Sequence, residues 1–215
     1  MINSDKKYIL GIGAGRDGTV SLSNMLNHFF NSEGSADSLA VHHEYCSREF
    51  YNLFAEICLK KRKKKPKKEL SELEKKIEKL ILNAPGLGTI GNGYSSIIDK
   101  FISKKNIILL HIQRKNVQEW TRSYINMSKV APEAYLRYGS PDQVGTVKRI
   151  AAFDLEEISE KEWYNLSLED RFLWYYEYTH NKIKQFSRKI PYFHIYTEDL
   201  NDQKILNSLE KFLIP

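Results

Sequence analysis

The chain has 215 residues, of which 41% are hydrophobic and 28% are charged, with a net charge of +6; this composition is typical of a globular protein with one sizeable core. No apolar run approaches the ~20 residues of a membrane span, and the polar N-terminus lacks the apolar stretch of a secretory signal. Cys46 and Cys58 are too few for a disulfide framework and no ligand spacing suggests a metal site, so we expect reduced thiols, no metal and a cytoplasmic location.

The first predicted elements are a buried strand, a glycine-rich turn and a helix. The apolar run 8–12 predicts the strand, and an apolar helical pattern begins at Thr19. Glycines allow positive φ and close approach to a ligand, and the free N–H groups of a first helical turn point toward an anion. The spacing from Gly13 to Gly18 imitates a nucleotide P-loop, but Thr19 stands where the lysine is expected, and the cation is Arg16. An ordinary glycine turn without a ligand is the alternative.

This loop resembles the 5′-phosphate loop of sulfotransferases that use 3′-phosphoadenosine-5′-phosphosulfate (PAPS). In that family a basic residue, a small residue, Gly and Thr open the first helix. The resemblance implies that the loop and first helical turn bind the donor; these residues are Gly15, Arg16, Asp17, Gly18, Thr19, Val20 and Ser21. Many members carry a second Thr at the position of Val20, so one hydroxyl contact to the phosphate would be missing here. The implied fold is a three-layer, P-loop NTPase-like α/β fold with a mostly parallel central sheet and helices on both faces.

A lysine-rich helical segment follows the second strand. We expect the second strand at 39–43 and two surface helices over 48–82, joined at Pro66, as an insertion in a single domain of 1–215. The run from Lys60 to Lys68 supplies more than the whole net charge, and such blocks are often solvated. No aromatic residues interleave with the lysines to stack bases, which argues against nucleic acid as a partner. A solvated face or a patch that attracts an acidic substrate is preferred.

The rest of the chain continues the alternation of strands and helices. The predicted elements are a short strand and turn at 89–93, a short helix at 95–103, a buried strand at 106–112, a helix at 117–129, an irregular region with short helices at 131–162, a helix at 168–189, a strand at 191–196 and a helix at 202–212. We expect the aromatic residues of the helix 168–189 to form core rather than a ligand platform. This alternation independently predicts a mostly parallel α/β sheet with helices on both faces.

Ligands of open α/β sheets bind beyond the carboxyl ends of the strands, and a second motif follows the strand 106–112 there. It resembles the 3′-phosphate site of sulfotransferases, where a basic residue at the strand end and a serine eight positions later hold one phosphate. Counted from Lys115 the serine is Ser123, whereas counted from Arg114 the eighth position is Arg122. We favour Arg114 with Ser123, because the planar arginine fork donates two parallel hydrogen bonds, and Lys115 and Arg122 remain candidates. Solvated cations and a surface serine are the alternative.

A third motif lies near the C-terminus. The segment 196–200, Tyr-Thr-Glu-Asp-Leu, and the helix end 212–215, Phe-Leu-Ile-Pro, resemble the terminal segments of the same family. The three motifs stand in the family order and together span positions 11 to 214.

The catalytic base is sought after the second strand, where His42, His43 and Glu44 lie. Carbohydrate and tyrosine sulfotransferases use a glutamate, and those acting on small phenols use a histidine. Strand alternation puts the two histidines on opposite faces, so at most one shares the cleft with Glu44 unless the strand ends there. We rank Glu44 first and His43 second, with Arg16 neutralising the leaving phosphate. A capped strand end with a structural histidine is the alternative.

These motifs predict a PAPS-dependent sulfotransferase. Its substrates would be PAPS, leaving 3′-phosphoadenosine-5′-phosphate (PAP) as product, and a hydroxyl acceptor such as a carbohydrate or a small molecule. A nucleotide kinase is the second interpretation, although the P-loop lysine and an evident aspartate for Mg²⁺ are missing. A non-catalytic PAP-binding module is the third, supported by Val20 and by a short C-terminal segment.

Overall fold

The computed structural model describes residues 7–31, 41–45, 47–62, 66–101, 106–130, 151–155 and 157–214. The chain forms two compact units. The first comprises residues 1–45, 83–116 and 180–215, and the second comprises residues 46–82 and 117–179. Whether these units act as the single predicted domain, with 48–82 as an insertion, stays a prediction, and each unit is described by itself.

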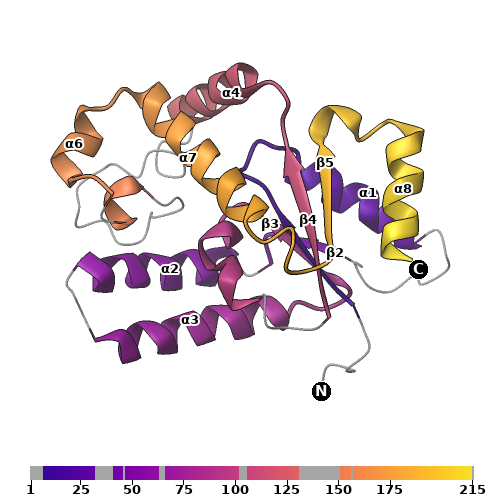
Figure 1. Cartoon of the computed structure of the whole chain (residues 1–215), viewed down its shortest axis with the longest axis horizontal. Helices are drawn as coiled ribbons and strands as arrows, with labels where there is room; N and C mark the ends of the chain where they lie inside the picture. Colours follow the sequence, from indigo (N-terminus) through magenta and orange to yellow (C-terminus); the bar gives the residue numbers. More distant parts are fainter. Residues whose placement is uncertain are drawn as a thin grey trace. The chain divides into compact units, whose positions relative to one another are not determined.

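The first unit is built on a five-stranded sheet in which every neighbouring pair is parallel, with the order β2-β3-β1-β4-β5 (Figure 1). The strands are β1 (Tyr8–Ile12), β2 (Val41–His43), β3 (Gly88–Gly91), β4 (Ile107–Gln113) and β5 (Tyr192–Tyr196). All seven residues of β4 are buried, as its continuous apolar run predicts for an inner strand of a parallel sheet. The α/β class with a parallel central sheet is confirmed, and the carboxyl ends of all five strands meet at one edge.

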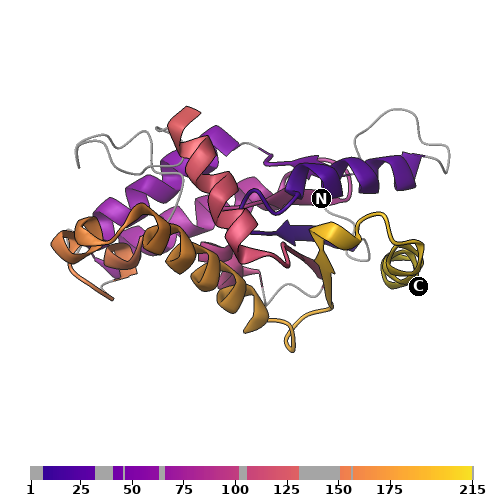
Figure 2. The same ribbon diagram turned by 90° about the horizontal axis from the view of Figure 1, so that it is seen from above.

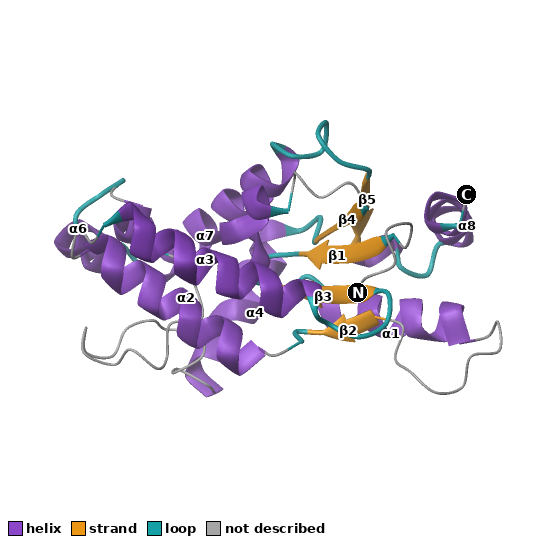
Figure 3. Ribbon diagram, turned by 90° about the horizontal axis from the view of Figure 1, so that it is seen from below, coloured by secondary structure: helices purple, strands orange, loops and turns teal. Residues whose placement is uncertain are grey.

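Two helices of this unit, α1 (Thr19–Asn31) and α8 (Gln203–Leu213), lie on the same face of the sheet (Figure 3). Their apolar sides join alternate strand residues in one core; its buried members are Ile9, Leu22, Leu26, Val41, Ile90, Ile108, Leu110, Ile112, Ile195, Leu209 and Leu213. The period-2 pattern of β4 therefore points Ile108, Leu110 and Ile112 toward this face and His111 away from it. This alternation has consequences for the buried histidines described below.

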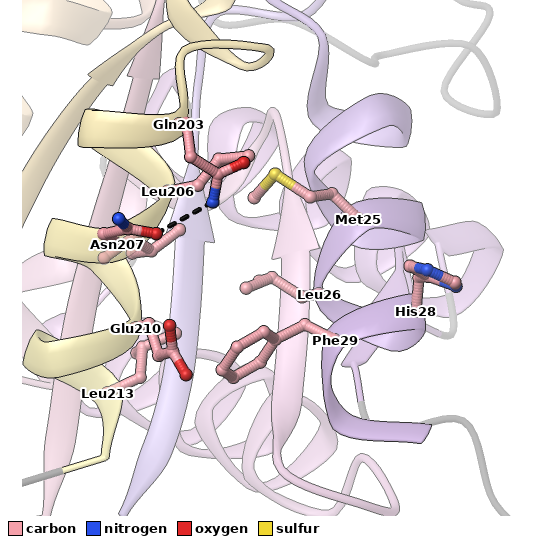
Figure 4. Close-up of a pocket in the computed structure, with 10 residues that line it drawn as sticks. Met25, Leu26, His28, Phe29, Gln203, Leu206, Asn207, Glu210 and Leu213 are labelled. Atoms are coloured by element: carbon pink, nitrogen blue, oxygen red, sulfur yellow. Dashed lines mark hydrogen bonds between the residues drawn. The ribbon is translucent and has the colours of Figure 1, made fainter. Parts of the chain in front are cut away.

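A partly open apolar cavity of about 220 Å³ lies between α1 and α8 (Figure 4). Met25 and Phe29 project into it from α1, and Leu206 lines it from α8. His28 points away from the cavity, while Gln203 donates a hydrogen bond of 2.8 Å to Asn207 along α8. The cavity is thus the outer margin of the core that holds the two helices on the sheet.

The remaining elements of the first unit are two short 3₁₀ helices, Tyr94–Lys100 and Thr197–Asp199. The helix predicted at 95–103 is the first of these. It begins where the Ser96 hydroxyl donates to the Gly93 carbonyl at 2.8 Å and ends where the Phe101 N–H donates to the Ile98 carbonyl at 3.0 Å. Such i to i+3 bonding forms short helices, which explains its length.

The second unit is helical in its described part. Its elements are α2 (Ser47–Arg62), α3 (Lys67–Leu82), α4 (Val117–Val130), the 3₁₀ helix Ala152–Leu155, α6 (Glu160–Asn165) and α7 (Leu168–Lys184), whose last turn belongs to the first unit. The helices α2 and α3 pack side by side, which confirms two helices separated near Pro66 (Figure 1). Within the described ranges, no helix is long and apolar enough to span a membrane.

Aromatic side chains of α7 form core, as predicted. Phe172, Tyr175 and Tyr176 are buried. The Tyr176 ring lies 4.7 Å from Trp120 of α4, and the Phe172 ring lies 5.1 Å from Tyr124.

A turn connects α7 to β5 (Figure 2). The predicted irregular region 131–162 falls largely outside the described residues, and its described part contains the predicted short helices.

Candidate functional site

The loop between β1 and α1 has a left-handed backbone at three positions. Gly15, Arg16 and Gly18 have φ values of 78°, 54° and 84°, in the left-handed region that favours glycine. At Gly18 a side chain would also be crowded, since an added Cβ would lie 2.8 Å from the Thr197 methyl group. Arg16 is not a glycine, so its left-handed backbone is held by its surroundings. Its side chain is exposed at the carboxyl edge of the sheet.

Asp17 turns its carboxylate into the loop. The side chain is fully buried and accepts hydrogen bonds from the Ala14 N–H and, at 3.3 Å, from the Arg114 N–H. The sequence places Asp17 among the donor-binding residues. An inward carboxylate instead organises the loop, so any contribution of Asp17 to anion binding would come from its backbone N–H.

Two arginines meet at this loop. The Arg114 Nε donates to the Arg16 carbonyl oxygen at 2.9 Å, so the residue after β4 supports the turn after β1. The predicted 5′-phosphate and 3′-phosphate motifs are therefore joined in the first unit through these two residues.

The terminal motif contacts Lys115. Lys115 Nζ lies 2.6 Å from Asp199 Oδ1 and sits 5.3 Å from the centre of the Tyr196 ring. The Lys115 N–H donates to the Glu198 carboxylate at 3.1 and 3.3 Å. The pKa of Lys115 is raised, mainly by its hydrogen bond to Asp199. Lys115 is thus paired with the acidic residues of this motif, and the choice of Arg114 over Lys115 as a phosphate ligand stays a prediction.

Thr197 of the same motif fastens β5 to the loop. Its hydroxyl donates to the Asp17 carbonyl oxygen and also lies 3.4 Å from the Gln113 carbonyl oxygen. One side chain thus joins the ends of β1, β4 and β5. The sequence marks this segment only as a family resemblance and does not reveal this role.

The predicted histidine base lies beside the first turn of α1. His43 Nε2 is 3.1 Å from the Thr19 hydroxyl, although the two residues are 24 positions apart. The contact follows from a clamp between α1 and β2. The Asn27 amide accepts from the Val41 N–H at 2.7 Å and donates to the Val41 carbonyl at 2.8 Å, and Ser23 donates to the same carbonyl at 3.0 Å.

Glu44 ends β2 in a constrained conformation. Its φ is 47°, and its N–H donates to the Ile90 carbonyl of β3 at 2.7 Å. Its carboxylate accepts a hydrogen bond from the Asn92 side-chain amide. A left-handed backbone at a residue other than glycine is often found at functional sites, where surrounding contacts hold it. No sequence motif marks Asn92, which follows β3.

The other predicted residues divide between the two units. Val20 is 52% exposed and Ser21 is also exposed on the first turn of α1, whereas Thr19 is buried. Ser123 and Arg122 lie on α4 in the second unit. Their approach to Arg114 stays a prediction.

This architecture, a parallel sheet with a glycine-containing loop between its first strand and first helix, is that of an α/β protein. No family model and no curated protein matches the chain. Among solved structures, the chain is similar to a sulfotransferase domain from the curacin biosynthetic pathway, at 15% sequence identity and a TM-score of 0.51. The match covers 97% of this chain and 74% of that one. The chain therefore has the fold of a sulfotransferase domain.

Proposed function

We propose that the protein is a PAPS-dependent sulfotransferase that acts on an acceptor hydroxyl. The observation that carries the proposal is the joining of Arg114 to the Arg16 turn, within a sulfotransferase fold. PAPS would supply the sulfuryl group, which moves from the 5′-phosphate oxygen to the acceptor oxygen while the acceptor proton moves to a base. The chain's task is then to hold two phosphates, stabilise developing charge and accept that proton.

The donor set fits a 5′-phosphate. The exposed Arg16 side chain, the Thr19 and Ser21 hydroxyls and the N–H groups of the first turn of α1 are all hydrogen-bond donors. The Asp17 carboxylate, which would repel an anion, is buried under the turn. Arg16 would neutralise charge on the leaving phosphate, and Arg114 with Ser123 would hold the 3′-phosphate.

Glu44 is the proposed general base. The Asn92 amide orients its carboxylate, and a group so oriented can take a proton from a hydroxyl placed beside it. His43 is the second candidate, and its contact with Thr19 places it next to the proposed phosphate site. The substitution His43→Asn is the matched control for Glu44→Gln. If His43→Asn abolished turnover and Glu44→Gln did not, the base would be the histidine.

Two rival functions make different predictions. A nucleotide kinase would bind ATP–Mg²⁺ through a P-loop lysine, but the residue after Gly18 is Thr19. A non-catalytic module would bind PAP without transferring the sulfuryl group. If the protein is a sulfotransferase, screening with labelled PAPS would show whether the acceptor is a carbohydrate or a small molecule.

A thermal-shift series with PAP, ADP and ATP–Mg²⁺ tests the donor. We expect PAP to give the largest stabilisation, because two separate groups of residues hold two phosphates. Stabilisation by ATP–Mg²⁺ without stabilisation by PAP would favour the kinase. Binding of PAP without turnover on any screened hydroxyl acceptor would favour the non-catalytic module.

A further inference from the structure

Four side chains form a connected polar chain under the loop, on the sheet face opposite α1 and α8. Tyr192 OH lies 2.7 Å from His111 Nδ1, and His111 Nε2 lies 2.7 Å from His180 Nδ1. His180 Nε2 faces Asp17 Oδ2 at 3.3 Å, the longest contact of the three and electrostatic rather than well aligned. Asp17, His180 and His111 are at most 2% exposed. The proposed sulfuryl transfer does not use the two histidines.

The positions of the protons along this chain follow from hydrogen-bond chemistry. An ionised Asp17 only accepts, so the nitrogen of His180 that faces it carries the proton. A neutral His180 then has an acceptor at Nδ1, which requires a proton on His111 Nε2. His111 in turn accepts at Nδ1 from the Tyr192 hydroxyl. When both histidines are neutral Nε2–H tautomers, the hydrogen bonds from Tyr192 to His111 and from His111 to His180 are both satisfied, and the His180 N–H faces Asp17.

The surroundings of His111 favour its neutral form. Burial is the main cause that lowers the pKa of His111 far below its ordinary value, and His180, His194 and Lys184 act in the same direction. The His194 ring stacks on His111 at 4.5 Å, and its own pKa is lowered to about 4, mainly by burial. The other oxygen of the Asp17 carboxylate, Oδ1, accepts from the Arg114 N–H at 3.3 Å.

We propose that His180 is a positioning residue that orients the Asp17 carboxylate and thereby fixes the phosphate loop and Arg114. Asp17 holds the Ala14 N–H and the Arg114 N–H with the same carboxylate, so its rotation would release the loop and the backbone of Arg114 together. His180 restricts that rotation through its contact with Asp17 Oδ2. The hydrogen bonds from Tyr192 to His111 and from His111 to His180 in turn determine which nitrogen of His180 carries the proton. This inference rests on the proposed function in taking PAP as the ligand.

Two variants of His180 test the proposal. His180→Gln keeps an N–H for Asp17 and an acceptor for His111, whereas His180→Leu removes both. We expect PAP affinity, measured by isothermal titration, to fall tenfold or more in the Leu variant and to stay within about threefold in the Gln variant. His194→Gln is the matched control. His194 lies beside His111 but makes none of the hydrogen bonds among Tyr192, His111, His180 and Asp17, so this variant should bind PAP like the wild type.

A spectroscopic readout separates positioning from general packing. Nitrogen-15 NMR of the apoprotein at pH 7 should show His111 and His180 as neutral Nε2–H tautomers, and His111→Gln should change the His180 signals. An Nδ1–H tautomer at either residue, or unchanged PAP affinity in His180→Leu, would overturn the proposal. If His180→Leu does not fold, a tenfold loss in His180→Gln also contradicts it. If the wild type does not bind PAP, the proposed function fails, and the tautomers alone decide the present inference.

Discussion

The buried histidines make the stability of the fold depend on pH in a way that can be calculated. In the unfolded chain a histidine binds a proton below about pH 6.5. In the folded protein burial holds the pKa of His111 far lower and that of His194 at about 4. Between these values the unfolded state binds more protons than the folded state. Stability from these groups is therefore fully present above pH 6.5 and is lost as the pH falls toward the folded-state pKa values.

The size of the loss follows from the pKa differences. Each pH unit over which the unfolded chain holds one extra proton costs about 1.4 kcal/mol. From pH 6.5 to pH 4.5, His111 accounts for about 3 kcal/mol of unfolding free energy. His194 is only half buried, so solvent screening reduces its share to about 1 kcal/mol. The expected total of about 4 kcal/mol is a large fraction of the stability of an ordinary domain.

Guanidinium unfolding at pH 7.0 and pH 4.5 measures this loss. His111→Gln retains a donor and an acceptor for its neighbours but cannot bind a proton. The loss of unfolding free energy on acidification should be about 3 kcal/mol smaller in this variant than in the wild type. Carboxylates contribute equally to both proteins and cancel in the comparison. Equal losses in the two proteins would refute the reasoning, because they would mean that folded His111 takes up a proton as readily as unfolded His111.

Three further predictions concern the candidate site and its support. Glu44→Gln should leave PAP affinity nearly intact and lower turnover by about 10²- to 10⁴-fold; loss of PAP binding would instead make this carboxylate structural. Arg114→Ala and Ser123→Ala should each reduce the preference for PAP over AMP by about one to two decades in titration calorimetry, and a wild-type preference in both variants would misplace the 3′-phosphate site. Asn27→Ala should lower the unfolding free energy by about 1–3 kcal/mol through loss of two hydrogen bonds, whereas the exposed Asn24→Ala on the same helix should change it by less than about 0.5 kcal/mol.

Local sequence patterns predict most of the fold. The apolar run of β4, the helix start at Thr19 and the break near Pro66 depend on neighbouring residues, and the structure places elements there as predicted. The position of β3 between β1 and β2 depends on pairing between residues about 80 and 47 positions apart, which no local pattern encodes. For that reason the residue after β3, Asn92, could not be assigned to the site.

The sequence predicts where the loop of the candidate site lies, but it does not predict the contacts that support the loop from inside. The glycine spacing and Arg16 identify the loop, because such turns need particular residue types. Asp17 looks like another loop residue in the sequence, since its inward orientation depends on His180 and Arg114, which come from distant segments. Thr197 is likewise an ordinary residue until the strand order brings β5 beside β4.

Glu44 and Arg16 are the described residues other than glycine that have positive φ. At each position glycine would relieve a backbone cost of roughly 1 kcal/mol, so a variant selected only for thermal resistance would tend to acquire it. The same replacements would delete the proposed base and the loop cation. A directed-evolution campaign for robustness on this scaffold should therefore hold both codons fixed, because there selection for stability and selection for turnover favour opposite residues.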